Sequence, residues 1–156
     1  MIEAQQLTAD DWRLWRHLRL AALAESPAAF GATLAEWTGP GDTEERWRAR
    51  LSNVPFNAVL RLDGEPAGMV GAYEQADGAV ELVSMWVTPH ARGHGVADAA
   101  VRAVLGWAGA RDVVLSVKAD NAPAIRLYRR HGFIDVGPSP DGPDERLMRR
   151  SPVTDE

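Results

Sequence analysis

Hydrophobic positions in the first third of the chain recur at the spacing of helices. One set lies three or four residues apart and would share a single apolar face: Trp12, Trp15, Leu18 and Ala22. Thr8 precedes this set and is expected to cap the helix, after an edge strand over residues 2–7. Further helices are expected over residues 27–37 and 43–51, separated by the glycine- and proline-containing residues 38–42.

From residue 57 the pattern changes to that of strands. Three strands are predicted over residues 57–62, 67–74 and 79–87, joined by turns at 63–64 and 76–78, so they would form an antiparallel meander. Strict alternation in the third strand would put on one face Ala79, Glu81, Val83, Met85 and Val87, and on the other Val80, Leu82, Ser84 and Trp86.

The last part of the chain alternates between helix and strand signals. Helices are expected over residues 96–109 and 123–131, with a short buried strand at 113–117 between them. Two more strands, 133–136 and 145–149, are expected to flank a loop rich in glycine and proline. This order predicts a mixed α+β fold, with antiparallel strands first and a strand–helix–strand unit in the middle.

Composition narrows the classes of protein that the pattern allows. The length of 156 residues suits a single domain over residues 1–156. The absence of cysteine excludes a disulfide scaffold, a thiolate metal site and a cysteine nucleophile. A net charge of −5 argues against nucleic acid as a partner. No apolar run approaches the roughly 20 residues of a membrane span, so a cytoplasmic protein without membrane contact is expected.

A glycine-rich loop between a strand and a helix is the most informative segment. Gly93 and Gly95 allow unusual dihedral angles, and the helix that follows begins with amides that lack intrahelical acceptors. Such amides can hold a phosphate, and Arg92 can add a charged contact. The loop lacks the lysine of a nucleotide P-loop, and Asp98 stands where a dinucleotide fingerprint needs a small residue.

Two motifs in this region resemble the GNAT superfamily of acetyl-CoA-dependent N-acetyltransferases. The first, [Q/R]-x-x-G-x-[G/A], is matched by Arg92-Gly93-His94-Gly95-Val96-Ala97. The second, Asn-x-x-Ala-x-x-x-Tyr-x-x-x-Gly-Phe, is matched from Asn121 to Phe133 and includes Tyr128. The resemblance implies a mostly antiparallel sheet of six to seven strands, splayed at the acetyl-CoA site by a bulge and flanked by about four helices.

The resemblance also implies how acetyl-CoA would bind. Amides from the loop and the first turn of the helix would hold its pyrophosphate: Gly93, His94, Gly95, Val96, Ala97 and Asp98. The main chain of Met85, Trp86 and Val87 would pair with the pantetheine arm, and Asn121 would contact the cofactor. Asp98 is an acidic residue at a phosphate site, so we expect its carboxylate to point away and cap the helix start.

Tyr128 and Glu81 are the candidate catalytic residues. By the resemblance, Tyr128 lies near the thioester sulfur and would protonate the leaving thiolate, a role that the intact motif favours over the alternative of a packed ring with its hydroxyl at the surface. Glu81 lies among apolar neighbours that would raise its carboxyl pKa, and it could take a proton from the acceptor amine; the alternative is an exposed strand start. Ser116 stands where members that acetylate ribosomal-protein N-termini usually carry a glutamate.

The sequence therefore predicts transfer of acetyl from acetyl-CoA to a primary amine by direct attack in a ternary complex, with no metal. The acceptor is a small molecule or a peptide that the sequence does not identify, and a homodimer is compatible with it. The alternative is a non-catalytic acyl-CoA-binding or protein-interaction domain on the same fold.

Overall fold

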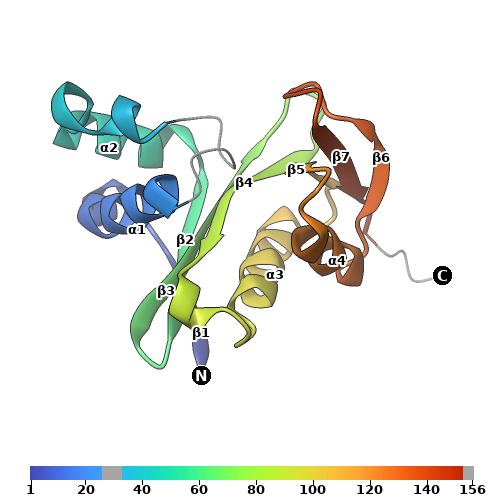
Figure 1. The fold of residues 1–156 in the computed structure, drawn as a ribbon, viewed down its shortest axis with the longest axis horizontal. Helices are drawn as coiled ribbons and strands as arrows, with labels where there is room; N and C mark the ends of the chain where they lie inside the picture. The colour runs from blue at the N-terminus through green and yellow to red at the C-terminus, as the bar shows by residue number, and fades with distance from the viewer. Residues whose placement is uncertain (26–32, 153–156) are drawn as a thin grey trace.

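A seven-stranded sheet forms the centre of the computed structural model, which describes residues 1–25 and 33–152 (Figure 1). The strand order is β1-β2-β3-β4-β5-β7-β6. The strands are β1 (Ile2–Gln6), β2 (Phe56–Leu62), β3 (Glu65–Glu74), β4 (Val80–Val87), β5 (Val113–Lys118), β6 (Ile134–Pro138) and β7 (Glu145–Arg150). Every neighbouring pair is antiparallel except β4 with β5, so the predicted mixed α+β class and the meander are confirmed.

Four α-helices in the described residues cover the two faces of this sheet (Figure 1). Helices α1 (Trp12–Glu25) and α2 (Glu44–Asn53) lie on one face, and α3 (Val96–Ala108) and α4 (Ala122–Arg130) lie on the other. Each face has its own hydrophobic core, because the apolar side chains of the strands alternate between them.

The predicted helices and strands lie within a few residues of the observed ones. Thr8 caps a short 3-10 turn, Ala9–Asp11, that leads directly into α1. The helix expected over residues 27–37 falls partly outside the described residues, and its described end is a 3-10 turn over Leu34–Trp37. None of the helices in residues 1–25 and 33–152 is long and apolar enough to cross a membrane.

The parallel strands β4 and β5 separate soon after they meet. They pair only at Val80 with Val113 and at Glu81 with Val114, whereas β5 goes on to pair with β7 along its whole length. The edge of β4 beyond Glu81 therefore has no strand partner on its β5 side within the described chain. This is the splayed sheet that the resemblance implied.

Strict alternation along β4 proved wrong, because a β-bulge interrupts it. The register of β3 with β4 shifts between Met69 and Gly71, and Ser84 takes the positive φ of 56° that marks the extra residue. Before the bulge, Val80 and Leu82 face the α3 side; after it, Met85 and Val87 face that same side. Glu81 therefore does not share a face with Met85 and Val87, and it lies on the α1 and α2 side of the strand.

Candidate active site

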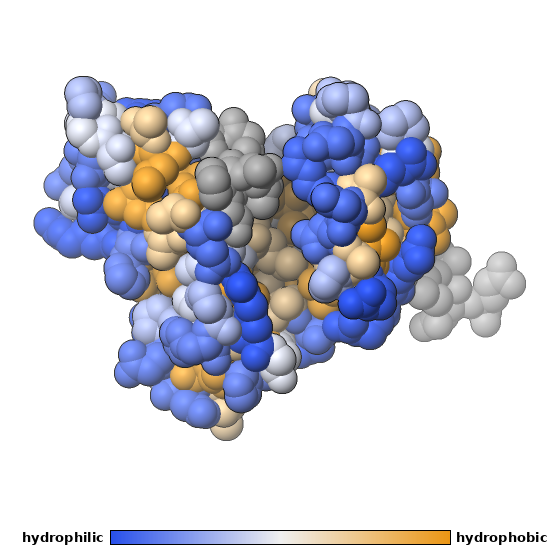
Figure 2. All heavy atoms as spheres, viewed as in Figure 1, coloured by the Kyte–Doolittle hydropathy of each residue, from blue (hydrophilic) through white to orange (hydrophobic). Residues whose placement is uncertain are grey.

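A cavity of about 970 Å³ opens where β4 and β5 separate. Figure 2 shows the hollow between the two halves of the molecule, with apolar atoms at its base. Its wall combines β4, β5, the glycine loop, the start of α3, one side of α4, the β6–β7 loop and the side of α1. It includes twelve of the thirteen predicted site residues: Glu81, Met85, Trp86, Val87, Arg92, Gly93, Gly95, Val96, Ala97, Asp98, Asn121 and Tyr128.

The glycine loop has the backbone that an anion cradle requires. Gly93 and Gly95 have φ values of 83° and 86°, a left-handed conformation that side-chain-bearing residues rarely adopt. Gly95 is the N-cap of α3, and as a glycine it has no side chain to bond to the first amides of the helix. The first intrahelical bond runs from the Ala99 amide to the Gly95 carbonyl, so the preceding amides of the first turn remain available to a ligand.

His94 is the predicted site residue that does not line the cavity, although its two glycine neighbours do. Its side chain lies toward the β2–β3 turn, where Asp63 is held by the N-terminal ammonium. That ammonium chiefly, and His94 in addition, lower the pKa of the Asp63 carboxyl. Any contribution of His94 to a ligand is therefore through its backbone amide.

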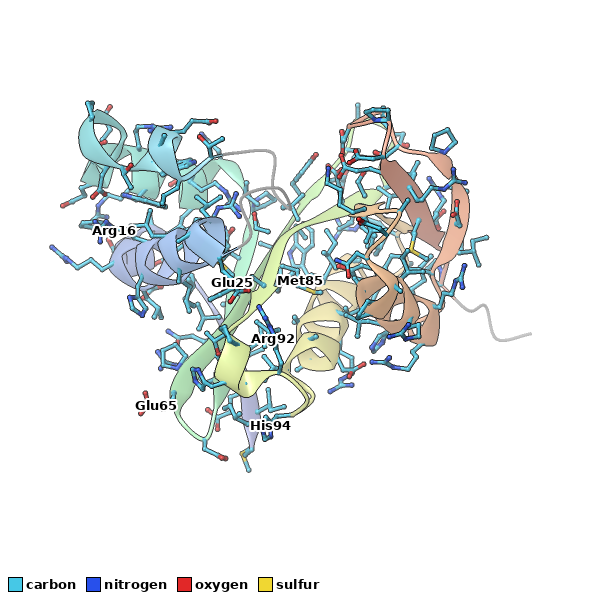
Figure 3. All side chains as sticks on the ribbon, in the orientation of Figure 1. Arg16, Glu25, Glu65, Met85, Arg92 and His94 are labelled. Carbon is cyan, nitrogen blue, oxygen red and sulfur yellow. The ribbon has the colours of Figure 1, made fainter. Side chains whose placement is uncertain are left out.

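Arg92 is held by the end of α1 as well as by its own loop. Its Nε donates to the Val87 carbonyl at 3.2 Å, and its guanidinium pairs with the Glu25 carboxylate. The indole of Trp86 donates to the same Glu25 carboxylate at 3.3 Å. Figure 3 shows Glu25 and Arg92 pointing toward each other beside Met85. The contact links α1 to the mouth of the glycine loop.

Asp98 does not cap its helix, contrary to expectation. Its carboxylate lies 3.2 Å from the Arg130 guanidinium and 2.8 Å from His131 Nε2, both at the end of α4. Desolvation opposes ionisation, but the bonds from His131 and Arg130 outweigh it and lower the pKa of Asp98. The predicted helix cap is wrong because the Asp98 carboxylate bonds to residues at the end of α4 and not to the amides of its own helix.

Asn121 and Tyr128 occupy the two ends of α4, and both line the cavity. Asn121 is the N-cap residue, and its side-chain oxygen accepts from the Ala124 amide at 3.3 Å. The Tyr128 side chain is only 7% exposed and packs its ring edge-on against Phe133, with centroids 5.8 Å apart. Burial raises the pKa of the Tyr128 phenol, so the hydroxyl keeps its proton throughout the neutral range.

Glu81 lines the cavity from β4, half-buried. Burial, and then the negative charge of Asp141, raise the pKa of the Glu81 carboxyl. Asp141 comes from the loop between β6 and β7, where its carboxylate accepts from the Ser116 hydroxyl at 2.8 Å. Ser116 also shares a 2.6 Å hydrogen bond with Ser139. Two carboxylates, Glu81 and Asp141, thus lie in the cavity wall where β4 and β5 separate. Sequence reasoning identified Glu81 but not Asp141.

Arg19 is the second residue that sequence reasoning missed. It lies on α1 four residues after Trp15, on the buried face of the helix, and it lines the cavity. Its side chain is 9% exposed, and burial lowers the pKa of the guanidinium to about 10. The sequence did carry a signal for Arg19, because an arginine on the apolar face of a helix is unusual. Arginine is almost never fully buried unless other groups compensate its charge.

The sequence matches the Acetyltransferase (GNAT) family over residues 12–133. Mycothiol acetyltransferase of Clavibacter michiganensis is 33% identical over 137 residues, which are 83% of this chain and 41% of that protein. L-amino acid N-acetyltransferase of Escherichia coli is 29% identical over 108 residues, which are 60% of this chain and 64% of that one.

Among solved structures, the PaiA N-acetyltransferase of Thermoplasma acidophilum in complex with coenzyme A has a TM-score of 0.70 at 14% identity, covering 97% of this chain and 99% of that one. That likeness is one of fold. The chain spans less than two thirds of the length of the two curated relatives described above. The family match covers most of the chain, including the glycine loop and α4. The chain therefore belongs to the acetyltransferase (GNAT) family.

Proposed function

We propose that residues 1–156 act as one N-acetyltransferase unit that transfers acetyl from acetyl-CoA to a primary amine by direct attack. The observation that carries the proposal is the cavity itself. It joins a glycine cradle suited to phosphate, an unpaired strand edge and a buried tyrosine in one continuous space.

The residues present fit acetyl-CoA at each step along this space. The amides at the start of α3 and the two left-handed glycines suit the pyrophosphate. The β4 edge from Met85 to Val87, free of a β5 partner, suits the amides of a pantetheine arm, which can pair with it as another strand would. The side chains of Met85 and Val87 pack against the α3-side core, which supports that edge from behind.

Tyr128 is suited to the departing sulfur. Attack of the amine nitrogen on the thioester carbon forms the amide and breaks the carbon–sulfur bond, which leaves a thiolate that must gain a proton. The raised pKa of Tyr128 guarantees a protonated donor at neutral pH. The phenol donates to the sulfur and regains its proton from solvent.

Glu81 is suited to the proton that the amine loses. An alkyl ammonium must be deprotonated before it can attack, and a carboxylate whose pKa is raised is a stronger base than an ordinary one. Glu81 and Tyr128 reach the cavity from opposite layers of the structure, because the bulge turns Glu81 toward α1 and α2 while α4 supplies Tyr128. Acceptor and donor would therefore meet at the splay from two sides.

The test is product formation from acetyl-CoA and a panel of primary amines, followed by thiol release and by mass spectrometry of the amines. Tyr128→Phe should lower kcat by about a hundredfold, within the range for loss of a general acid. The other tyrosine provides the matched control: Tyr73→Phe, on β3 and outside the cavity wall, should retain the wild-type rate. Acetyl-CoA binding without thiol release for every amine would instead support a non-catalytic acyl-CoA-binding domain.

A further inference from the structure

The α1 wall of the cavity carries a buried positive charge that the transfer reaction does not use. Arg19 lines the cavity and is 9% exposed, and its guanidinium stays protonated at neutral pH even though burial lowers its pKa to about 10. The helical spacing that puts Trp15 in the core also puts Arg19 there, since the two residues are four positions apart. The charge is thus carried on the buried face of α1.

A second arginine, Arg50 of α2, stands directly behind this wall. It donates to Asn57 Oδ1 at 2.7 Å and to the hydroxyl of Ser84, the bulge residue, at 3.1 Å. Its guanidinium also lies 4.9 Å from the centre of the Trp15 ring. Burial first, and then repulsion from the charge of Arg19, lower the pKa of Arg50 to about 10. The two guanidinium groups are therefore close enough to interact electrostatically.

The hydrogen-bond partners of Arg50 in the described chain are both neutral, so neither of them offsets its charge. Arginines in other parts of the chain bond to carboxylates: Arg16 to Asp42, Arg48 to Glu44, Arg111 to Glu74, Arg146 to Asp135 and Arg149 to Asp112. Arg19 in the cavity wall and Arg50 behind it therefore place two positive charges in a low-dielectric part of the α1 and α2 side. In such a wall an anionic guest is favoured over a neutral one more strongly than in water.

Two carboxylates lie in another part of the cavity wall. Glu81 and Asp141 both line the cavity, and the charge of Asp141 adds to burial in raising the pKa of the Glu81 carboxyl. An ammonium group is attracted to this part of the wall and can lose its proton there. The cavity thus has a place for an amine beside Glu81 and Asp141, and a place for an anion beside Arg19.

We propose that the acceptor is an amine that also carries a carboxylate, as a free amino acid does, and that Arg19 binds this carboxylate. A guanidinium holds a carboxylate through two parallel hydrogen bonds, which fixes its orientation as well as its position. Arg50 acts as a positioning residue: it adds positive charge behind Arg19 and holds Ser84, from which β4 continues toward the cofactor wall. The inference rests on the proposed function, since it names the acceptor of the same reaction.

The first experiment compares acceptors and leaves the protein unchanged. An L-amino acid, its carboxamide and the corresponding decarboxylated amine are assayed with saturating acetyl-CoA. We expect kcat/KM for the carboxylate-bearing amine to exceed that of both neutral analogues by at least about tenfold, the effect of one hydrogen-bonded charge. Equal or better use of the neutral analogues would overturn the inference and leave the proposed function standing. No acetylation of any amine would overturn both.

The second experiment assigns the preference to Arg19. In Arg19→Gln the preference should fall to near unity, through loss of kcat/KM for the amino acid, while the carboxamide keeps its rate. Arg13→Gln is the matched control, because Arg13 is exposed on the same helix outside the cavity wall, and it should keep the full preference. Circular dichroism checks that both variants fold. A folded Arg19→Gln variant that still prefers the carboxylate would show that another group binds it.

Discussion

Gly68 of β3 lies where an added methyl group would press on the cofactor wall. A Cβ at this position would lie 2.9 Å from the Trp86 carbonyl oxygen and 3.0 Å from a methyl carbon of Val96. The first is backbone of β4, one residue before Val87, which pairs with Gly68 in the sheet; the second belongs to the first residue of α3. Both Trp86 and Val96 line the cavity, so Gly68→Ala must displace one of them.

The size of the effect follows from overpacking. Forcing a methyl group into a filled core typically costs about 1–3 kcal/mol. For a chain of this length each kcal/mol lowers the melting temperature by roughly 2–4 °C, so Gly68→Ala should melt roughly 2–12 °C below the wild type. It should also raise KM for acetyl-CoA, because the displaced atoms belong to the wall on which the pantetheine arm is proposed to lie.

Gly106 provides a control of the opposite sign. It lies within α3 on the exposed side, and a Cβ there would meet nothing within 4 Å. Gly106→Ala should raise the stability by about 0.5–1 kcal/mol through helix propensity alone. Thermal unfolding followed by circular dichroism, together with acetyl-CoA titrations of the initial rate, measures both variants. A Gly68→Ala variant with unchanged melting temperature and unchanged KM would refute the packing described around Trp86.

Three further substitutions test individual charges. Glu81→Gln should reduce the rate of acetyl transfer most at low pH, where free amine is scarcest, and an unchanged pH–rate profile would remove Glu81 as the base. Asp42 accepts bonds from Arg16 and Trp47 that lower its pKa to about 2, so its stabilising effect is complete above about pH 4 and is lost as the pH falls toward 2. Asp42→Asn should therefore narrow the difference between urea midpoints at pH 7 and pH 3, and a difference as wide as that of the wild type would contradict this. Asp98→Asn removes a negative charge from the wall of the proposed phosphate site, so KM for acetyl-CoA should fall a few-fold at low salt; a higher KM would show that the carboxylate positions its α4 partners for the cofactor.

The parts of the fold that depend on local signals could be predicted from the sequence. Turns at glycines, the meander and the helix that opens after Gly95 follow from residues close in the chain, and they lie within a few residues of the predicted positions. Burial of Trp15 and Trp47, whose side chains are wholly enclosed, also follows from helical spacing. These features can be predicted without knowing how the helices and strands pack against one another.

The errors came from contacts between distant residues. The bulge at Ser84 depends on the register of β3 against β4, which no pattern within β4 reveals. Asp98 finds Arg130 thirty-two positions away, so a helix-cap argument confined to its own turn could not place it. Asp141 reaches the site because the β6–β7 loop folds back to Ser116. The proposed catalytic machinery is assembled by such long-range contacts, which is why its electrostatics became visible only in three dimensions.

The bulge at Ser84 also lets one strand supply side chains to both layers of helices. Because one extra residue reverses which face each later side chain takes, β4 presents Glu81 to the layer of α1 and α2, and Met85 to the layer of α3 and α4. The two layers have separate cores, so substitutions in one need not repack the other. A protein engineer could therefore redesign the α1 and α2 layer to admit a new acceptor without rebuilding the glycine cradle, provided that Glu25 of α1 keeps its contact with Arg92.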